Sequence, residues 1–185
     1  YMQLEGYAYR LMPVAVPGAS DGYVNSDIMY TNMTKKTFWR QFDNPDVYYD
    51  ETYKGPPVIS ARIAFFRLAD QLIREGNEAR AREVLNYSLK VIPDKSIPYD
   101  QISSNYVRFL FAVGDAKKAL EIADVMATRA DQNLTYDKSG RGRFGSPDAD
   151  LYILQTIVEA CKEAKQSAAA SKYEAIFQKH INAFG

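Results

Sequence analysis

Apolar residues from Pro56 onward recur at intervals of three and four positions, the spacing that places side chains on one face of an α-helix. The Pro56-Pro57 pair suits a helix start, and Gly76 suits a helix end because glycine takes the left-handed conformation without strain. The pattern predicts six main helices in three antiparallel pairs, over residues 56–76, 78–92, 98–113, 115 to beyond 127, 147–165 and 169–183.

Residues 1–55 have a different character, being rich in tyrosine and holding the only tryptophan, Trp39. The stretch 3–14 favours a short extended segment, and 17–22 favours a loop. Asn25 or Ser26 is expected to cap a short helix that ends near Lys36. We therefore predict an irregular N-terminal segment over residues 1–55, packed on a helical domain over residues 56–185.

Two helix-turn-helix units match each other 38 residues apart. In the first, Gly76-Asn77 is followed by Ala81, and in the second, Gly114-Asp115 is followed by Ala119. A self-similar period of this length is typical of helical hairpins that bury their apolar faces by stacking side by side. Such hairpins present a surface to other molecules and seldom carry out chemistry.

The two units resemble tetratricopeptide repeats. Phe65 stands where that family usually has tryptophan, Ala81 where the paired helices cross, and Pro93 at the closing proline; the packing positions are filled by Leu68, Ala69 and Leu72. The second unit departs from the family pattern, because it has Ser103 at the tryptophan position and Asp131 in place of the closing proline. A third pair, too degenerate to align, is expected to cap the array. The predicted fold is thus mainly α, a TPR-like superhelix of about three helical hairpins.

Composition excludes several classes of protein. Basic and acidic residues number 23 each, so no net charge attracts nucleic acid. The single cysteine, Cys161, excludes an internal disulfide and a cysteine-cluster metal site. No apolar run approaches the ~18 residues of a membrane span, and residues 1–17 lack the pattern of a secretory signal. Because the chain starts at Tyr1 inside an alternating segment, we interpret it as a fragment of a longer protein.

A second resemblance covers nearly the whole chain. Residues 3–14 look like the segment after the last membrane helix in a bacterial family of multi-pass membrane proteins; other matching stretches are Tyr30, Phe38-Trp39, 44–48 and 92–99. Members of that family resemble GT-C-type glycosyltransferases and a vertebrate protein O-mannosyltransferase that also ends in TPR-like repeats. The resemblance implies an extramembrane C-terminal tail on the periplasmic face, with the membrane-embedded part of the same polypeptide as a partner. The family's catalytic acidic residues would precede Tyr1, so none is assigned here.

Residues with catalytic or metal-binding potential are few. His180 is the only histidine, and its sequence neighbours Gln178, Lys179 and Asn182 are poor partners, so we expect a structural or solvent-exposed role. Cys161 lies in register with apolar residues and is expected in the core. The acidic residues Asp43, Asp46, Asp50 and Glu51 lack the spacing of an EF-hand loop, so solvated turn positions are favoured over calcium binding. No catalytic residue, metal site or cofactor is predicted.

Binding surfaces are the remaining candidates. One is a groove lined by the first helix of each pair, where a charged or polar row would hydrogen-bond an extended peptide: Arg67, Asp70, Arg74, Asn105 and Arg108. The N-terminal segment is an alternative occupant of this groove. The other is a basic loop that suits an anionic membrane or an acidic partner, or is simply exposed: Lys138, Arg141 and Arg143. The tyrosines of the N-terminal segment suit either packing or contact with a glycan.

These observations favour a non-catalytic accessory or protein-interaction domain of a membrane-embedded glycosyltransferase-like protein, with a protein or peptide as ligand. The alternative is a free-standing TPR-type scaffold or peptide-binding protein unrelated to glycosylation. A small α-helical hydrolase or lyase is disfavoured, because the sequence shows no acid–base or nucleophilic constellation.

Overall fold

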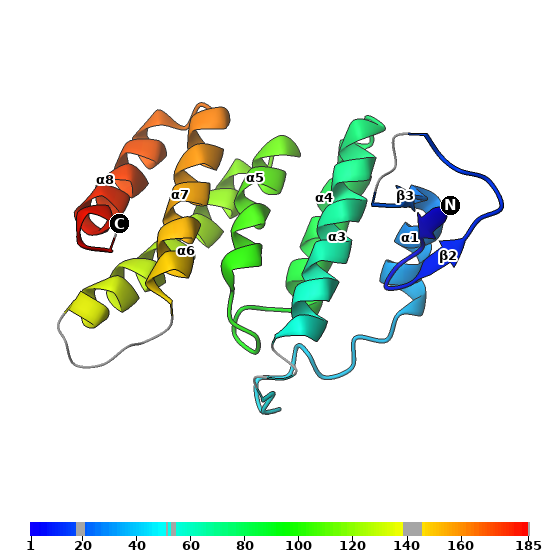
Figure 1. Ribbon diagram of the computed structural model, residues 1–185, viewed down its shortest axis with the longest axis horizontal. Coiled ribbons are helices and arrows are strands. Elements are labelled where there is room, and N and C mark those ends of the chain that lie inside the picture. The colour runs from blue at the N-terminus through cyan, green and yellow to red at the C-terminus, as the bar shows by residue number, and fades with distance from the viewer. Residues whose placement is uncertain (18–20, 51, 53–54, 139–145, 185) are drawn as a thin grey trace. The chain divides into compact units, whose positions relative to one another are not determined.

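The computed structural model describes residues 1–17, 21–50, 52, 55–138 and 146–184 (Figure 1). The fold is mainly α-helical, with one small sheet near the N-terminus, which confirms the predicted class. The chain divides into two compact units, Tyr1–Pro98 and Tyr99–Gly185. The first unit contains the N-terminal segment and the first predicted helix pair, so the division predicted after residue 55 falls inside it. Each unit is described below by itself.

The N-terminal segment of the first unit folds into a three-stranded sheet with the order β2-β1-β3. Strand β1, Met2–Leu4, pairs antiparallel with β2, Tyr9–Leu11, and parallel with β3, Tyr23–Val24. The extended segment predicted for residues 3–14 is therefore a hairpin. The residues that lead into β3 pack against this hairpin and require glycine at residue 22. There φ is 87°, and an added Cβ would lie 2.7 Å from the Tyr9 ring.

A short helix ties this segment to the first helix pair. Helix α1, Ser26–Thr31, continues into one π-helical turn, η1, Asn32–Lys36. Of the two predicted caps, Asn25 is the one observed: its side chain accepts a hydrogen bond from the Ile28 N–H at 3.1 Å. Met29 and Met33 are fully buried, and Tyr30 Oη donates to Glu83 at 2.7 Å. The N-terminal segment thus packs on the helices, as expected.

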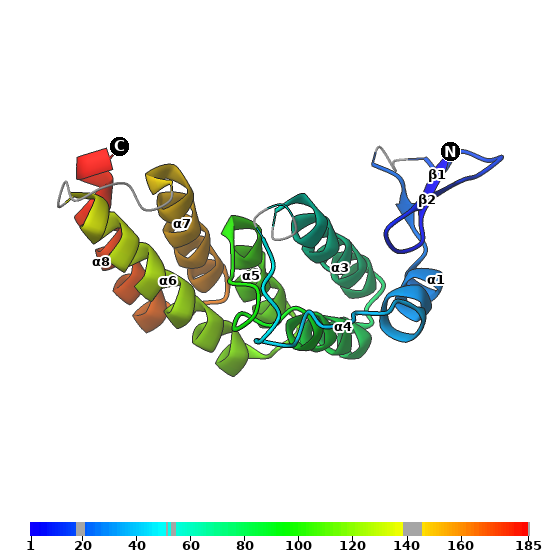
Figure 2. The same ribbon diagram turned by 90° about the horizontal axis from the view of Figure 1, so that it is seen from below.

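The first hairpin consists of α3, Pro56–Arg74, and α4, Glu78–Val91, which lie side by side in Figures 1 and 2. Its core is formed by fully buried side chains from both helices: Phe65, Leu68, Leu72, Ala81, Val84 and Leu85. The Trp39 ring stacks on Phe65 with 5.2 Å between ring centroids, so the N-terminal segment contributes to this core.

The second unit contains two more hairpins. The first consists of a 3₁₀ turn η2, Gln101–Ser104, helix α5, Asn105–Ala112, and helix α6, Ala116–Lys138. The second consists of α7, Pro147–Glu163, and α8, Ser167–Phe184. Two predicted boundaries were wrong. The helix expected from Pro98 begins at Gln101, where Asp100 and Ser103 form a capping box. Lys138, which was expected in the basic loop, is instead the last residue of α6.

All three hairpins close with the same turn. The amide N–H groups of Asn77, Asp115 and Gln166 each donate to the carbonyl five residues earlier, at 2.8 Å in every case. The preceding residue is left-handed each time: Gly76 with φ 73°, Gly114 with φ 74° and Lys165 with φ 57°. An alanine follows five residues later in each hairpin, with exposures of 0%, 0% and 5% for Ala81, Ala119 and Ala170. The third pair, which the sequence pattern left unaligned, is therefore built like the other two.

The described residues include no helix with the length and apolar content needed to cross a lipid bilayer.

Candidate functional site

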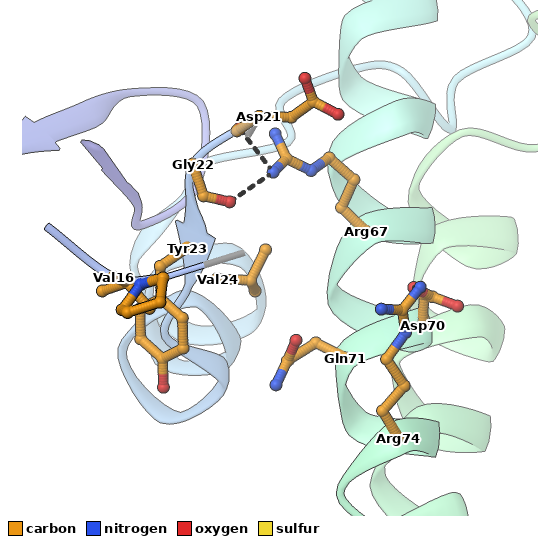
Figure 3. Close-up of a pocket in the computed structure, with 10 residues that line it drawn as sticks. Val16, Asp21, Gly22, Tyr23, Val24, Arg67, Asp70, Gln71 and Arg74 are labelled. Atoms are coloured by element: carbon orange, nitrogen blue, oxygen red, sulfur yellow. Dashed lines mark hydrogen bonds and ion pairs between the residues drawn. The ribbon is translucent and has the colours of Figure 1, made fainter. Parts of the chain in front are cut away.

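A pocket of about 570 Å³ lies in the first unit, between α3 and the N-terminal segment (Figure 3). Three of the five predicted groove residues line it: Arg67, Asp70 and Arg74. The opposite wall comes from the loop before β3 and from β3 itself, with lining residues Val16, Pro17, Asp21, Gly22, Tyr23 and Val24. The sequence pattern thus identified the α3 wall of the pocket but not the other wall.

Arg67 is bound by the protein's own N-terminal segment. Its Nη2 donates to the carbonyl oxygens of Asp21 at 2.8 Å and Gly22 at 3.0 Å, and Nη1 donates to Tyr9 Oη. These bonds satisfy backbone carbonyls beside the two-residue strand β3, which is an edge strand of the sheet as described. The guanidinium therefore fixes the segment on α3, as the dashed lines in Figure 3 show. Around Arg67, the N-terminal segment occupies the face that was predicted to bind a peptide.

The other α3 side chains leave the pocket open to solvent. Arg74 Nη2 lies 2.8 Å from Asp70 Oδ2, one helical turn away, and their side chains are 72% and 43% exposed. Gln71 extends from α3 toward Val24 in Figure 3, and its amide donates to Glu75 at 2.8 Å. An exposed pair of this kind contributes less than about 1 kcal/mol to stability. Asp70, Gln71 and Arg74 therefore present polar groups to this pocket, and the partners described for them lie on α3 or at its C-terminal end.

A second pocket, of about 300 Å³, lies in the second unit between α5 and α7. Helix α5 contributes Arg108, Phe111 and Ala112, α7 contributes Ala160 and Glu163, and Ala164 follows directly after α7. These two helices are the first helices of their hairpins and contact each other directly. The pocket therefore combines one cationic and one anionic side chain with a small apolar surface.

The two charges in this pocket are not neutralised by ion pairs within the described part of the chain. Arg108 places its guanidinium carbon 4.8 Å from the centre of the Phe109 ring, a cation–π contact that orients the side chain without using its N–H donors. Glu163 is the last residue of α7, where the negative end of the helix dipole disfavours a carboxylate. Helix stability does not account for an acidic residue at that position.

Asn105, the fifth predicted groove residue, has a local role. Its side-chain amide donates to the Ile102 carbonyl at 3.0 Å, within the turn that starts α5. The five predicted residues divide between the two units, with Arg67, Asp70 and Arg74 in the first, and Asn105 and Arg108 in the second. That they form one continuous groove stays a prediction.

Of the three residues predicted for the basic loop, the structure describes only Lys138. Lys138 ends α6, and its ammonium group donates to the Lys179 carbonyl on α8 at 2.9 Å. Arg141 and Arg143 lie outside the described residues, as does Glu51 of the acidic cluster.

One buried polar side chain has a partner that the sequence did not reveal. His180 is fully buried, and its Nε2 lies 2.6 Å from Asp131 Oδ1, which also accepts a hydrogen bond from Lys179 at 2.8 Å. Asp131 comes from α6, 49 residues away in sequence, so reading the neighbours of His180 along the chain missed it. Because the histidine side chain is out of reach of solvent and substrate, the pair serves packing between α6 and α8.

Cys161 is fully buried, as expected for a core residue. Burial raises the pKa of its thiol to about 11, with a further contribution from Asp124. The thiolate needed for nucleophilic chemistry is thus disfavoured at this position. Among the described residues, no cluster of three or more histidine, cysteine or acidic side chains is arranged to hold a metal ion.

Comparison of the chain with protein-family models, with curated proteins and with solved structures found no match.

Proposed function

We propose that this chain is a non-catalytic interaction domain that binds an extended peptide or protein segment. The observation that carries the proposal is the pocket between α5 and α7, where Arg108 and Glu163 line a small apolar surface and form no ion pair among the described residues. Two unpaired charges on rigid helices favour recognition of a partner with complementary groups, since the helices fix their positions before binding.

The repeated hairpin supports the same function. Each hairpin buries an alanine near its crossing point and leaves polar positions of its first helix exposed, which is typical of proteins that bind through the surface of stacked hairpins. In the first unit the corresponding helix face is partly covered by the N-terminal segment through Arg67. We therefore propose the second unit as the part that binds the ligand.

We further propose that the parent protein is a membrane-embedded enzyme of the glycosyltransferase type, with this domain on the periplasmic face. This part of the proposal rests on the resemblance of residues 3–14 and the other matching stretches. The coding sequence upstream of Tyr1 tests it: several apolar spans are expected there, and a start codon directly upstream would favour the free-standing scaffold.

Binding is tested by selecting peptides from a displayed random library on the immobilised chain. We expect enriched peptides whose affinity falls about fivefold or more in Arg108→Ala, because the variant removes a charge that lines the pocket. Lys117→Ala is the matched control, since Lys117 is an exposed cation on α6 that does not line the pocket. If no peptide is enriched above a blank surface, the proposed function is wrong.

A further inference from the structure

We infer that the pocket between α5 and α7 selects a partner segment by the order of its charges, with an acidic residue directed to α5 and a basic residue directed to α7. The inference rests on the proposed function and deepens it by naming the ligand's chemistry. It follows from the placement of Arg108 on one wall and Glu163 on the other.

The two side chains do not satisfy each other. Arg108 and Glu163 line the same pocket of about 300 Å³ but form no ion pair with each other or with other described residues. Opposite charges that share a pocket without pairing leave an electric field across it, from the positive charge on α5 to the negative charge on α7. A segment with the reverse polarity complements that field, and a segment with two like charges is repelled at one end.

The surface between the charges is small and apolar. Ala112, Ala160 and Ala164 line the pocket with only a methyl group each, which leaves room for a ligand side chain, and Phe111 adds an aromatic surface. A partner segment that carries an apolar residue between its two charges fits this arrangement. The arrangement does not fit a nucleic acid, because Glu163 would repel a phosphate chain.

The location of Glu163 is a second, independent observation. A carboxylate at the C-terminal residue of α7 is unfavourable for the helix, whereas a cation or a neutral residue would be favourable. Arg108 likewise holds its charge over Phe109, at the pocket, without an ion-pair partner among the described residues. The position of Glu163 thus sacrifices some local stability, which is common where side chains serve binding.

The experiment exchanges the two charges. The double variant Arg108→Glu, Glu163→Arg and the wild-type chain are used to select separate pools from the same displayed library of internal peptide segments. The wild-type pool is expected to be enriched in segments with one acidic and one basic residue in a single order around an apolar residue, and the exchanged variant in the opposite order. Each charge of a wild-type peptide should contribute about a two- to fivefold change in affinity when replaced by glutamine.

The control variant Lys117→Glu, Glu121→Lys exchanges an exposed pair on α6 outside the pocket and should retain the wild-type order. Circular dichroism of both variants establishes that they are folded. Enriched peptides without a charge pattern, or with a pattern that the exchange at residues 108 and 163 leaves unchanged, would overturn this inference while leaving the proposed function in place. A library that yields no binder at all would overturn both.

Discussion

His180 and Asp131 form a partly buried contact of 2.6 Å between α8 and α6, and the same relationship recurs seven residues earlier. There Tyr173 Oη donates to Asp124 Oδ1 at 2.7 Å. In both cases the residue before the aromatic side chain is a lysine, Lys179 or Lys172, that also donates to the aspartate. Seven residues correspond to about two helical turns, so the two contacts lie on the same faces of the two helices. They fix the register of α8 on α6.

The contact predicts a measurable coupling between Asp131 and His180. Replacing Asp131 with alanine leaves a buried imidazole and a lysine without their acceptor, so we expect the free energy of unfolding to fall by about 2 kcal/mol. A double-mutant cycle of Asp131→Ala and His180→Ala, measured by urea denaturation at pH 7, should give an interaction free energy of about 1 kcal/mol between the two side chains. Additive effects of the two substitutions would contradict a direct interaction.

The same coupling should weaken in acid. Burial alone would raise the pKa of Asp131, but hydrogen bonds from Lys179 and His180 outweigh it and hold the pKa below its usual value. A carboxyl group with a lowered pKa in the folded state contributes stability above its unfolded pKa of about 4 and loses it as pH falls through the folded value. The coupling measured at pH 7 should therefore decrease below about pH 4.

Asp150, in the first turn of α7, has the opposite pH dependence. Burial raises its pKa to about 6, against a hydrogen bond from Asn133, and the nearby Asp137 raises it further. Because the folded state binds a proton at a higher pH than the unfolded state, the group lowers stability progressively as pH rises from about 4 to 6. Asp150→Asn should then stabilise the chain by about 1–2 kcal/mol at pH 7.5 and have little effect at pH 4.

Urea denaturation at the two pH values measures this difference. Asp148→Asn is the matched control, because Asp148 is exposed in the same helical turn and should lose only a small interaction with the helix dipole. Equal destabilisation by Asp150→Asn at both pH values would contradict the assigned cause.

Lys165 occupies the left-handed position that is glycine in the other two hairpins. A residue with a Cβ is strained in this conformation, so Lys165→Gly should raise the free energy of unfolding by about 0.5–1 kcal/mol. Gly76→Ala is the reciprocal test. An added Cβ at residue 76 meets no atom within 4 Å, so the expected loss of about 1 kcal/mol comes from its φ of 73° alone. Thermal denaturation of both variants decides whether the third turn is equivalent to the first.

The buried alanine of each hairpin has a side chain small enough to let its two helices approach closely. Ala81 is fully buried between α3 and α4, so Ala81→Leu should cost about 1–3 kcal/mol by overpacking. Ala79→Leu, at an exposed position of the same helix, should change stability by less than about 0.5 kcal/mol. Equal effects of the two substitutions in chemical denaturation would show that Ala81 does not lie at a close contact.

Local patterns in the sequence determined the helices, the glycine turns at Gly76 and Gly114, and the buried alanines that follow them. These features depend on residues within a few positions of each other, whose spacing and backbone preferences can be read directly along the chain. The third turn escaped this reasoning, because Lys165 takes the left-handed conformation without the glycine that signals it. Its spacing of 51 residues from Gly114 also departs from the spacing of the first two turns.

Only the tertiary structure decided which side chains meet. It brings Asp131 to His180 across 49 residues, ties Arg67 to the carbonyls of the N-terminal segment, and places Glu163 in one pocket with Arg108. Arg67 and Arg108 are both arginines on the first helix of a hairpin, yet one binds the chain's own backbone and the other lines an open pocket. The difference comes from which neighbouring segment packs against each helix, and packing between distant segments leaves no periodic trace in the sequence.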